Sequence, residues 1–168
     1  DDGSPFDGIR KKPFETANKL LLSPGTSQVY YGDESARSLA VGGTEGDAKL
    51  RSFMNWDSIA KRPRTKRVLA HWQKLGKFRA QHPAVGAGVH QMITSQPYYF
   101  YRTYQKGAYK DLVVIGLNTH NGAKSIDVSK LYKDGDIIHD AYSGITSEVK
   151  NGRVTIDSEF DIVLLAKK

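Results

Sequence analysis

The 168-residue sequence has no cysteine, and it contains only two methionines and two tryptophans. The absence of cysteine excludes disulfide bonds and thiol chemistry, and it fits a secreted protein as well as a cytoplasmic one. No apolar run approaches the roughly 20 residues that a membrane-spanning helix needs. No signal peptide is recognisable either. Hydrophobic residues at 39% and charged residues at 26% are typical of globular domains, so we expect one domain or two small ones.

Several kinds of functional site are also missing from the sequence. The five histidines show no metal-ligand spacing, and there is no glycine-rich phosphate loop. No convincing Ser/His/Asp set is present. The sequence therefore indicates neither a metal centre, nor a nucleotide site, nor a serine-type catalytic triad.

A net charge of +7 is the one bulk property that suggests a partner. Much of the excess lies in a single basic run, residues 61–67, which could contact phosphates or act as a localisation signal. The run directly precedes an amphipathic helix and has no aromatic platform beside it. A solvated loop and first helical turn explain it better, and nucleic acid is the less favoured partner.

Apolar periodicity predicts two helices in the first half of the chain, over residues 13–22 and 64–82. The second has Trp72 on its apolar stripe, so we expect Trp72 in the core. Between the helices, Pro24-Gly25 stops the first one, and residues 28–31 read as a short strand before Gly32. A long loop of about residues 35–61 follows, and loops of this length are usually functional or disordered.

The second half changes to short alternating strands separated by turn residues. Asn151-Gly152 is its strongest hairpin signal. Many short antiparallel strands at regular spacing predict a β-sandwich. The expected strands span residues 89–94, 98–104, 112–118, 125–128, 137–141, 146–149, 154–156 and 160–166. Tyrosines of the second strand could stack on sugars, although aromatic residues alternating in a strand are mostly core and rim.

Two stretches carry a family resemblance. Residues 23–34, SPGTSQVYYGDE, resemble the segment through the eighth barrel strand of the α-amylase family of glycoside hydrolases (family 13), with Ser27 where the family pattern has proline. Residues 69–86, LAHWQKLGKFRAQHPAVG, resemble the eighth barrel helix and the exit from it into a glycine hinge at residues 86–88. The resemblance implies an α/β plus all-β architecture: residues 1–86 form the last part of a (β/α)8 TIM barrel, and residues 87–168 form a C-terminal antiparallel β-sandwich.

The same resemblance implies roles for three residues. Asp1 lies where the family has a catalytic aspartate after the seventh strand, one that stabilises the transition state. Asp47 and Arg51, four residues apart, match a pair that holds a glucose ring at the cleaved bond. Carboxylate and guanidinium groups suit vicinal sugar hydroxyls; the alternative is a surface ion pair. Trp56 could offer a flat face to a sugar, but a core position is the favoured interpretation.

The resemblance implies that the chain is part of a retaining α-amylase or α-glucosidase that cleaves α-glucans or maltooligosaccharides outside the cytoplasm, in the periplasm or the extracellular space. A whole barrel takes about 250 residues, so we expect a missing N-terminal barrel portion as a partner, which could be a separate chain, and no activity from this chain alone. No cofactor is expected in this chain; calcium is a candidate only in the missing part. Alternatives are a non-catalytic carbohydrate-binding or structural module and, less favoured, a nucleic-acid binder.

Overall fold

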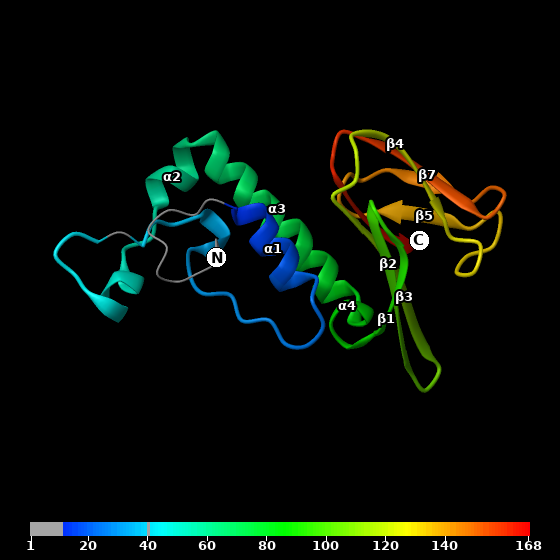
Figure 1. The fold of residues 1–168 in the computed structure, drawn as a ribbon, viewed down its shortest axis with the longest axis horizontal. Coiled ribbons are helices and arrows are strands. Elements are labelled where there is room, and N and C mark those ends of the chain that lie inside the picture. Colours follow the sequence, from blue (N-terminus) through cyan, green and yellow to red (C-terminus); the bar gives the residue numbers. More distant parts are fainter. Residues whose placement is uncertain (1–11, 40) are drawn as a thin grey trace. The chain divides into compact units, whose positions relative to one another are not determined.

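A computed structural model describes residues 12–39 and 41–168. The chain divides into two compact units, Asp1–Lys77 and Phe78–Lys168, whose elements are labelled in Figure 1. The first unit holds α1 (Pro13–Leu21), the 3-10 turns η1 (Asp33–Ser35) and η2 (Gly46–Arg51), α2 (Trp56–Lys61) and the start of α3 (Pro63–Gln81). Within the described residues, no helix combines the length and apolar character needed to cross a membrane.

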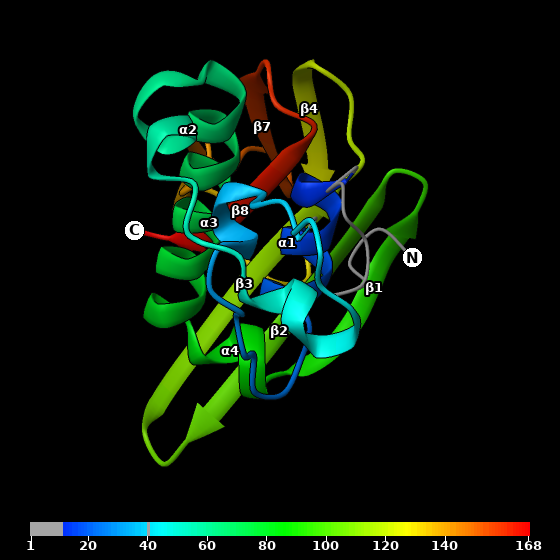
Figure 2. The ribbon, with the colours of Figure 1, turned by 90° about the vertical axis from the view of Figure 1, so that its left-hand side faces the viewer.

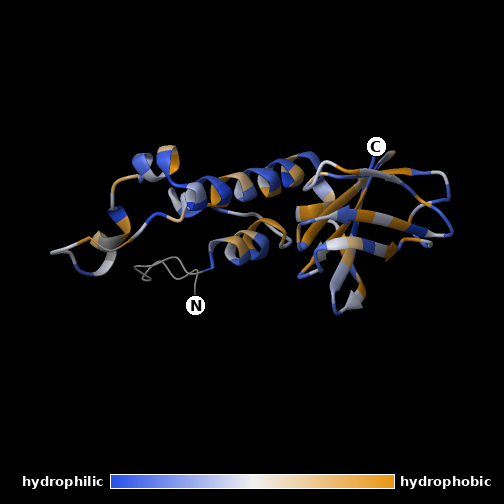
Figure 3. Ribbon diagram, turned by 90° about the horizontal axis from the view of Figure 1, so that it is seen from above, coloured by the Kyte–Doolittle hydropathy of each residue, from blue (hydrophilic) through white to orange (hydrophobic). Residues whose placement is uncertain are grey.

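The two helices predicted for the first half are confirmed. α1 begins with Pro13, whose missing N–H costs nothing at a helix start, and carries Glu15 in its first turn. On α3 the hydrophobic residues recur at helical spacing (Figure 3), and Trp72 is in the core as predicted, only 4% exposed. His71 of α3 contacts Phe14 of α1: the two rings are 5.1 Å apart, and Nε2 of His71 lies 3.2 Å from the Phe14 carbonyl oxygen.

The strand predicted at residues 28–31 is wrong, because the structure assigns no strand to this segment. Its β-branched and aromatic residues favour an extended backbone, but a strand needs a hydrogen-bonded neighbouring strand. The described part of the first unit supplies no second strand. Val29, Tyr30 and Tyr31 are therefore partly exposed on an extended loop.

A second prediction for this unit is also wrong. Trp56 was expected in the core, but it is 69% exposed. It is the first residue of α2, a helix of a turn and a half that buries none of its own residues. The long loop predicted around it is correspondingly interrupted by η2 and α2.

The second unit is a β-sandwich, as predicted. Its strands are β1 (Val89–Ser95), β2 (Tyr98–Lys106), β3 (Tyr109–Leu117), β4 (Gly122–Asp127), β5 (Ile137–Asp140), β6 (Thr146–Glu148), β7 (Arg153–Ser158) and β8 (Ile162–Lys167). A six-stranded sheet has the order β1-β2-β3-β8-β5-β6, and a two-stranded sheet pairs β4 with β7. All pairings are antiparallel.

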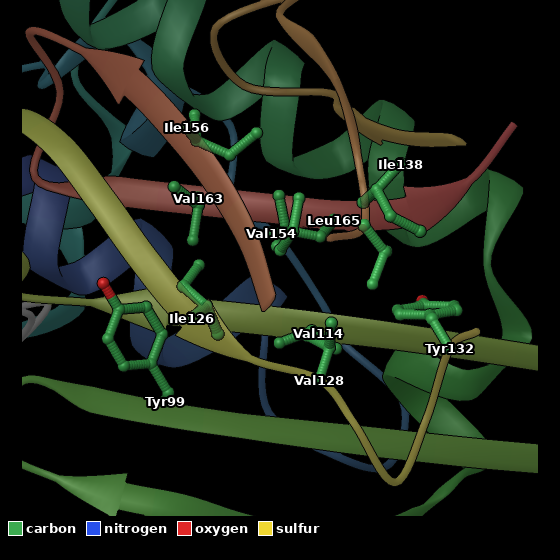
Figure 4. Close-up of a cluster of buried hydrophobic side chains, with 11 residues drawn as sticks. Tyr99, Val114, Ile126, Val128, Tyr132, Ile138, Val154, Ile156, Val163 and Leu165 are labelled. Carbon is green, nitrogen blue, oxygen red and sulfur yellow. The ribbon is translucent and has the colours of Figure 1, made fainter. Parts of the chain in front are cut away.

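The core of the sandwich is a cluster of eleven buried residues drawn from both sheets (Figure 4). Ile126, Val154 and Ile156 of the small sheet face Val114 and Leu165 of the large one. Alternation along β7 explains this, because its even-numbered residues are buried and its odd-numbered ones exposed. Full burial of such a side chain contributes about 1.5–3 kcal/mol, so this cluster is the main source of stability in the unit.

The turn predicted at Asn151-Gly152 is present, but the strands around it do not form a hairpin. Both residues have positive φ, 51° and 70°, and Lys150 and Arg153 exchange backbone hydrogen bonds across them. Beyond that bridge the chain separates, because β6 pairs with β5 and β7 pairs with β4. The tight turn thus carries the chain from one sheet to the other.

A short helix, α4 (Pro83–Ala87), stands where the sequence predicted a glycine hinge, so that prediction is wrong for Gly86 and Ala87. α4 contacts β2 and β3 (Figure 2). The Asp111 carboxylate accepts the backbone N–H of Ala84 at 2.9 Å and lies 2.9 Å from Nδ1 of His82. Arg102 donates to the Val85 carbonyl, so three side-chain contacts fasten this short helix to the sheet.

Candidate functional site

The best-organised polar region of the first unit is a loop cluster centred on Arg37. Its side chain is 1% exposed although it lies in a surface loop. Nε donates to the Tyr31 carbonyl at 3.1 Å, Nη1 to the Ser52 carbonyl at 2.9 Å and Nη2 to the Leu50 carbonyl at 3.1 Å. Nη1 also contacts the Ser52 hydroxyl. One guanidinium therefore fastens residues 31 and 50–52 together, although nineteen to twenty-one residues separate them.

Two tyrosines complete the connection. The Tyr30 hydroxyl donates to the Leu50 carbonyl at 3.0 Å, and the Tyr31 hydroxyl donates to the Ser52 carbonyl at 3.1 Å. The guanidinium carbon of Arg37 lies 4.1 Å from the centre of the Tyr31 ring, a cation–π contact. Desolvation and then the neighbouring Tyr31 raise the pKa of Tyr30, which keeps its hydroxyl protonated as a donor.

Gly32 is required by this arrangement. It adopts φ +87°, and a Cβ there would lie 2.3 Å from Nε of Arg37. Its carbonyl accepts the backbone N–H of Arg37 at 2.8 Å, which closes the loop on itself. The glycine thus serves both the left-handed backbone and the close approach of the buried arginine.

A second connection joins the same loop to the start of α2. The Ser35 hydroxyl donates to Oδ1 of Asn55 at 2.7 Å, and Nδ2 of Asn55 donates back to the Ser35 carbonyl at 3.1 Å. Residues 46–55 are therefore held at their C-terminal end by Arg37 and by Ser35. A segment fixed in this way presents its remaining side chains in a defined geometry.

The predicted site residues are placed as follows. Arg51 is the last residue of η2 and is exposed, between the two residues whose carbonyls Arg37 holds. Its charge acts on the Tyr30 hydroxyl. The backbone of Asp47 belongs to η2, but its side chain is outside the described part of the structure, as is the whole of Asp1. The prediction that Asp47 and Arg51 act as a pair therefore remains a prediction.

Sequence reasoning missed Arg37, Ser35 and Asn55. No periodicity marks them, because each acts through a single tertiary hydrogen bond or a small group of them. The only signal in the sequence is the composition of the loop, in which Gly32, Asp33 and Ser35 indicate a tight turn. That composition predicts a turn and does not predict which distant carbonyls it will bind.

The chemical capacity of this region is polar recognition. A free guanidinium face at Arg51, held on a fixed backbone, can donate several hydrogen bonds to hydroxyl groups. In the described residues no group of three or more histidine, aspartate and glutamate side chains is placed to hold a metal ion. The arrangement suits binding and orientation of a hydroxyl-rich ligand.

Comparison with known proteins fits this geometry. The chain is 42% identical, over 101 residues that make up 60% of its length, to the periplasmic α-amylase of Escherichia coli K12. Its fold matches an Anoxybacillus α-amylase over 93% of the chain, with a TM-score of 0.60 and 25% identity. The chain is thus similar to α-amylases in both sequence and fold. A further fold match is the α-amylase of Geobacillus thermoleovorans solved with acarbose, at a TM-score of 0.61 and 17% identity over 96% of the chain.

The chain spans only part of the length of each of these proteins. It covers 14% of the E. coli protein, 32% of the Anoxybacillus enzyme and 37% of the Geobacillus enzyme. No model of a known protein family matches it.

Proposed function

We propose that this chain forms the last part of the catalytic (β/α)8 barrel, residues 1–86, and the terminal sandwich, residues 87–168, of an α-glucan-cleaving glycoside hydrolase. The observation that carries the proposal is the exposed Arg51 on a loop that the buried Arg37 fixes, in a chain 42% identical over 101 residues to a periplasmic α-amylase. An exposed guanidinium on a backbone segment that is held in place can bind and orient the hydroxyl groups of a sugar ring.

Exposed aromatic residues of the first unit support the barrel part of the proposal. Phe53 is 98% exposed and Trp56 is 69% exposed, and Val29, Tyr30 and Tyr31 of the same unit are partly exposed. Several large apolar side chains exposed in one unit indicate a surface that another part of a protein covers. Here the missing portion of the barrel is the partner that we propose.

The catalytic residues of a retaining glycoside hydrolase would be divided between this chain and the missing part of the barrel. Retaining hydrolysis needs a nucleophilic carboxylate and an acid/base carboxylate about 5–5.5 Å apart. We assign neither to this chain. Asp1 would stabilise the transition state, and Asp47 and Arg51 would hold the glucose ring on the non-reducing side of the cleaved bond. The chain by itself is therefore inactive, and any calcium that the whole protein binds is held outside it.

The substrate we propose is an α-glucan or a maltooligosaccharide. A fold neighbour at a TM-score of 0.63 was solved with maltose, and the Geobacillus neighbour with acarbose. We also propose a periplasmic or extracellular location, because the E. coli relative is a periplasmic α-amylase.

The test is reconstitution. The 168-residue chain is mixed with the N-terminal barrel portion, and the release of reducing ends from maltoheptaose is followed. We expect no turnover from either part alone and turnover from the mixture. In the reconstituted enzyme Arg51→Ala should lower kcat/KM by about 100-fold with a change in stability below about 1 kcal/mol. Turnover by the isolated chain, or unchanged kinetics in Arg51→Ala, would overturn the proposal.

A further inference from the structure

A surface hollow of about 440 Å³ lies at one end of the sandwich. Its walls come from the turn between β1 and β2, with Gln96 and Pro97, and from the loop after β3, with Asn118, Thr119 and His120. Pairing of Tyr98 with Leu117 across β2 and β3 brings these two connections to the same end of the sheet. The hollow belongs entirely to the second unit and is separate from the Arg51 loop.

The hollow is lined by uncharged hydrogen-bonding groups. Gln96 and Asn118 offer amides, and none of the seven lining residues is an aspartate, a glutamate, a lysine or an arginine. Nε2 of His120 lies 2.8 Å from the Ala123 carbonyl. Because a carbonyl only accepts, Nε2 of His120 donates this hydrogen bond. Mixed donors and acceptors without a formal charge favour a neutral, hydroxyl-rich ligand over an ion.

Tyr98 adds an aromatic wall to the hollow, and contacts with Phe100 and His90 hold its ring in position. Its ring lies 5.1 Å from that of Phe100, and its hydroxyl is 3.0 Å from Nε2 of His90. Arg102 donates to Nδ1 of His90 at 3.3 Å, so Nε2 must carry the proton and donate to Tyr98. Burial and the charge of Arg102 lower the pKa of His90, which keeps this neutral tautomer. The Tyr98 hydroxyl therefore accepts from His90, which fixes the orientation of the ring.

The loop wall is also ordered before any ligand arrives. Asn118 adopts φ +53°, a left-handed conformation that asparagine tolerates well. The backbone N–H of Thr119 donates to the Asp161 carbonyl at 2.8 Å. Oγ1 of Thr119 is buried without a hydrogen-bond partner in the described structure. An oxygen without accessible surface is out of reach of a ligand, so Thr119 shapes the wall, and the exposed Asn118 and His120 supply its polar groups.

We infer that this hollow is a second binding site, for a neutral oligosaccharide, with Tyr98 as its aromatic wall and Gln96, Asn118 and His120 as its hydrogen-bonding groups. The choice of an α-linked glucan as the occupant rests on the proposed function. The site itself rests on the lining chemistry alone. It would bind a polymeric substrate without taking part in cleavage.

The experiment is an NMR titration of the ¹⁵N-labelled 168-residue chain with maltoheptaose and, in parallel, with cellohexaose. We expect saturable shifts of the backbone amides of residues 95, 96, 98 and 118–120. Asn118→Gly removes one amide and keeps the left-handed backbone, so it should weaken binding by about two- to tenfold, the effect of one hydrogen bond. Tyr98→Ala should weaken it at least as much.

The matched control is Tyr109→Ala. Tyr109 is 51% exposed and pairs with Lys106 at the opposite end of β2 and β3, so its removal should leave the affinity unchanged. Absence of saturable shifts in the hollow, shifts confined to residues 46–55, or an unchanged affinity of a folded Asn118→Gly chain would each overturn the inference. Equal binding of the two sugars would support the site itself. It would count against an α-glucan as the occupant, which is the part of the inference that rests on the proposed function.

Discussion

At the scale of single residues, one buried cation organises the first unit. Arg37 donates to three backbone carbonyls from two segments, and carbonyls at such a point must be satisfied because burying them unbonded costs free energy. Lysine would keep the charge at this position, but its single ammonium cannot reach three diverging carbonyls as a planar guanidinium does.

We therefore expect Arg37→Lys to lower the stability of the loop cluster by about 2 kcal/mol. Hydrogen exchange should become faster at the amides of residues 31–37 and 50–55, and reconstituted activity should fall with it, because Arg51 is carried on the loosened segment. Arg67→Lys, an exchange at an exposed position of α3, is the control and should change neither. Equal exchange rates in Arg37→Lys and the parent chain would show that the guanidinium does not hold the loop.

His90 supplies a second residue-scale prediction, on pH dependence. Its pKa is lowered in the folded state, chiefly by burial and then by Arg102. The unfolded chain therefore takes up a proton first as the pH falls. The stabilisation is fully present above the unfolded-state value of about 6.5 and is lost as the pH falls from there towards the folded-state pKa.

The measurement is the urea midpoint of the sandwich between about pH 8 and about pH 5. His90→Gln should show a smaller loss of midpoint over this range than the parent chain. His139→Gln, a change on another strand of the same sandwich, is the control and should keep the parent slope. A His90→Gln slope identical to that of the parent would remove His90 as the cause.

At the scale of elements, the sequence predicts the sandwich well and the loop cluster poorly, for one physical reason. The alternation of buried and exposed residues along β7 and the positive-φ turn at residues 151–152 are local properties that depend directly on the amino-acid sequence. Residues 28–31 carry equally strong strand letters, yet strand formation depends on a neighbour that the described part of the first unit does not provide. The prediction that Trp56 lies in the core was wrong for a similar reason, because α2 is short and no neighbouring element buries this side chain.

The α4–β1 junction gives the element-scale prediction. A Cβ at Gly88 would lie 2.4 Å from the Ala84 carbonyl oxygen and 2.9 Å from that of Thr103, both backbone atoms that cannot rotate away. Gly88→Ala should therefore destabilise the sandwich by about 1–3 kcal/mol. Gly76→Ala is the matched control in α3: nothing lies within 4 Å of its Cβ position, so the exchange should stabilise the helix by about 0.5–1 kcal/mol. Urea midpoints of both variants provide the check, and equal effects of the same sign would contradict the close-approach argument.

At the scale of the whole molecule, the two units differ in how much of their apolar surface they bury themselves. The second unit closes a core of eleven residues between two sheets. The first leaves Phe53 and Trp56 largely exposed and forms no strand in its described residues. Each large side chain left in water forgoes about 1.5–3 kcal/mol of burial.

We accordingly expect the second unit to be stable by itself and the first to require the rest of the barrel. In hydrogen exchange of the 168-residue chain, the amides of β2, β3 and β8 should be strongly protected, because they open only when the sandwich unfolds. The amides of residues 13–21 and 63–77 should exchange much faster, since their unit lacks the surface that would cover them. Addition of the N-terminal barrel portion should slow exchange in these helices and leave the sandwich unchanged. Equal protection of α1 and β3 in a monomer of the isolated chain would show that the first unit folds without a partner, and would count against its role as a piece of a larger barrel.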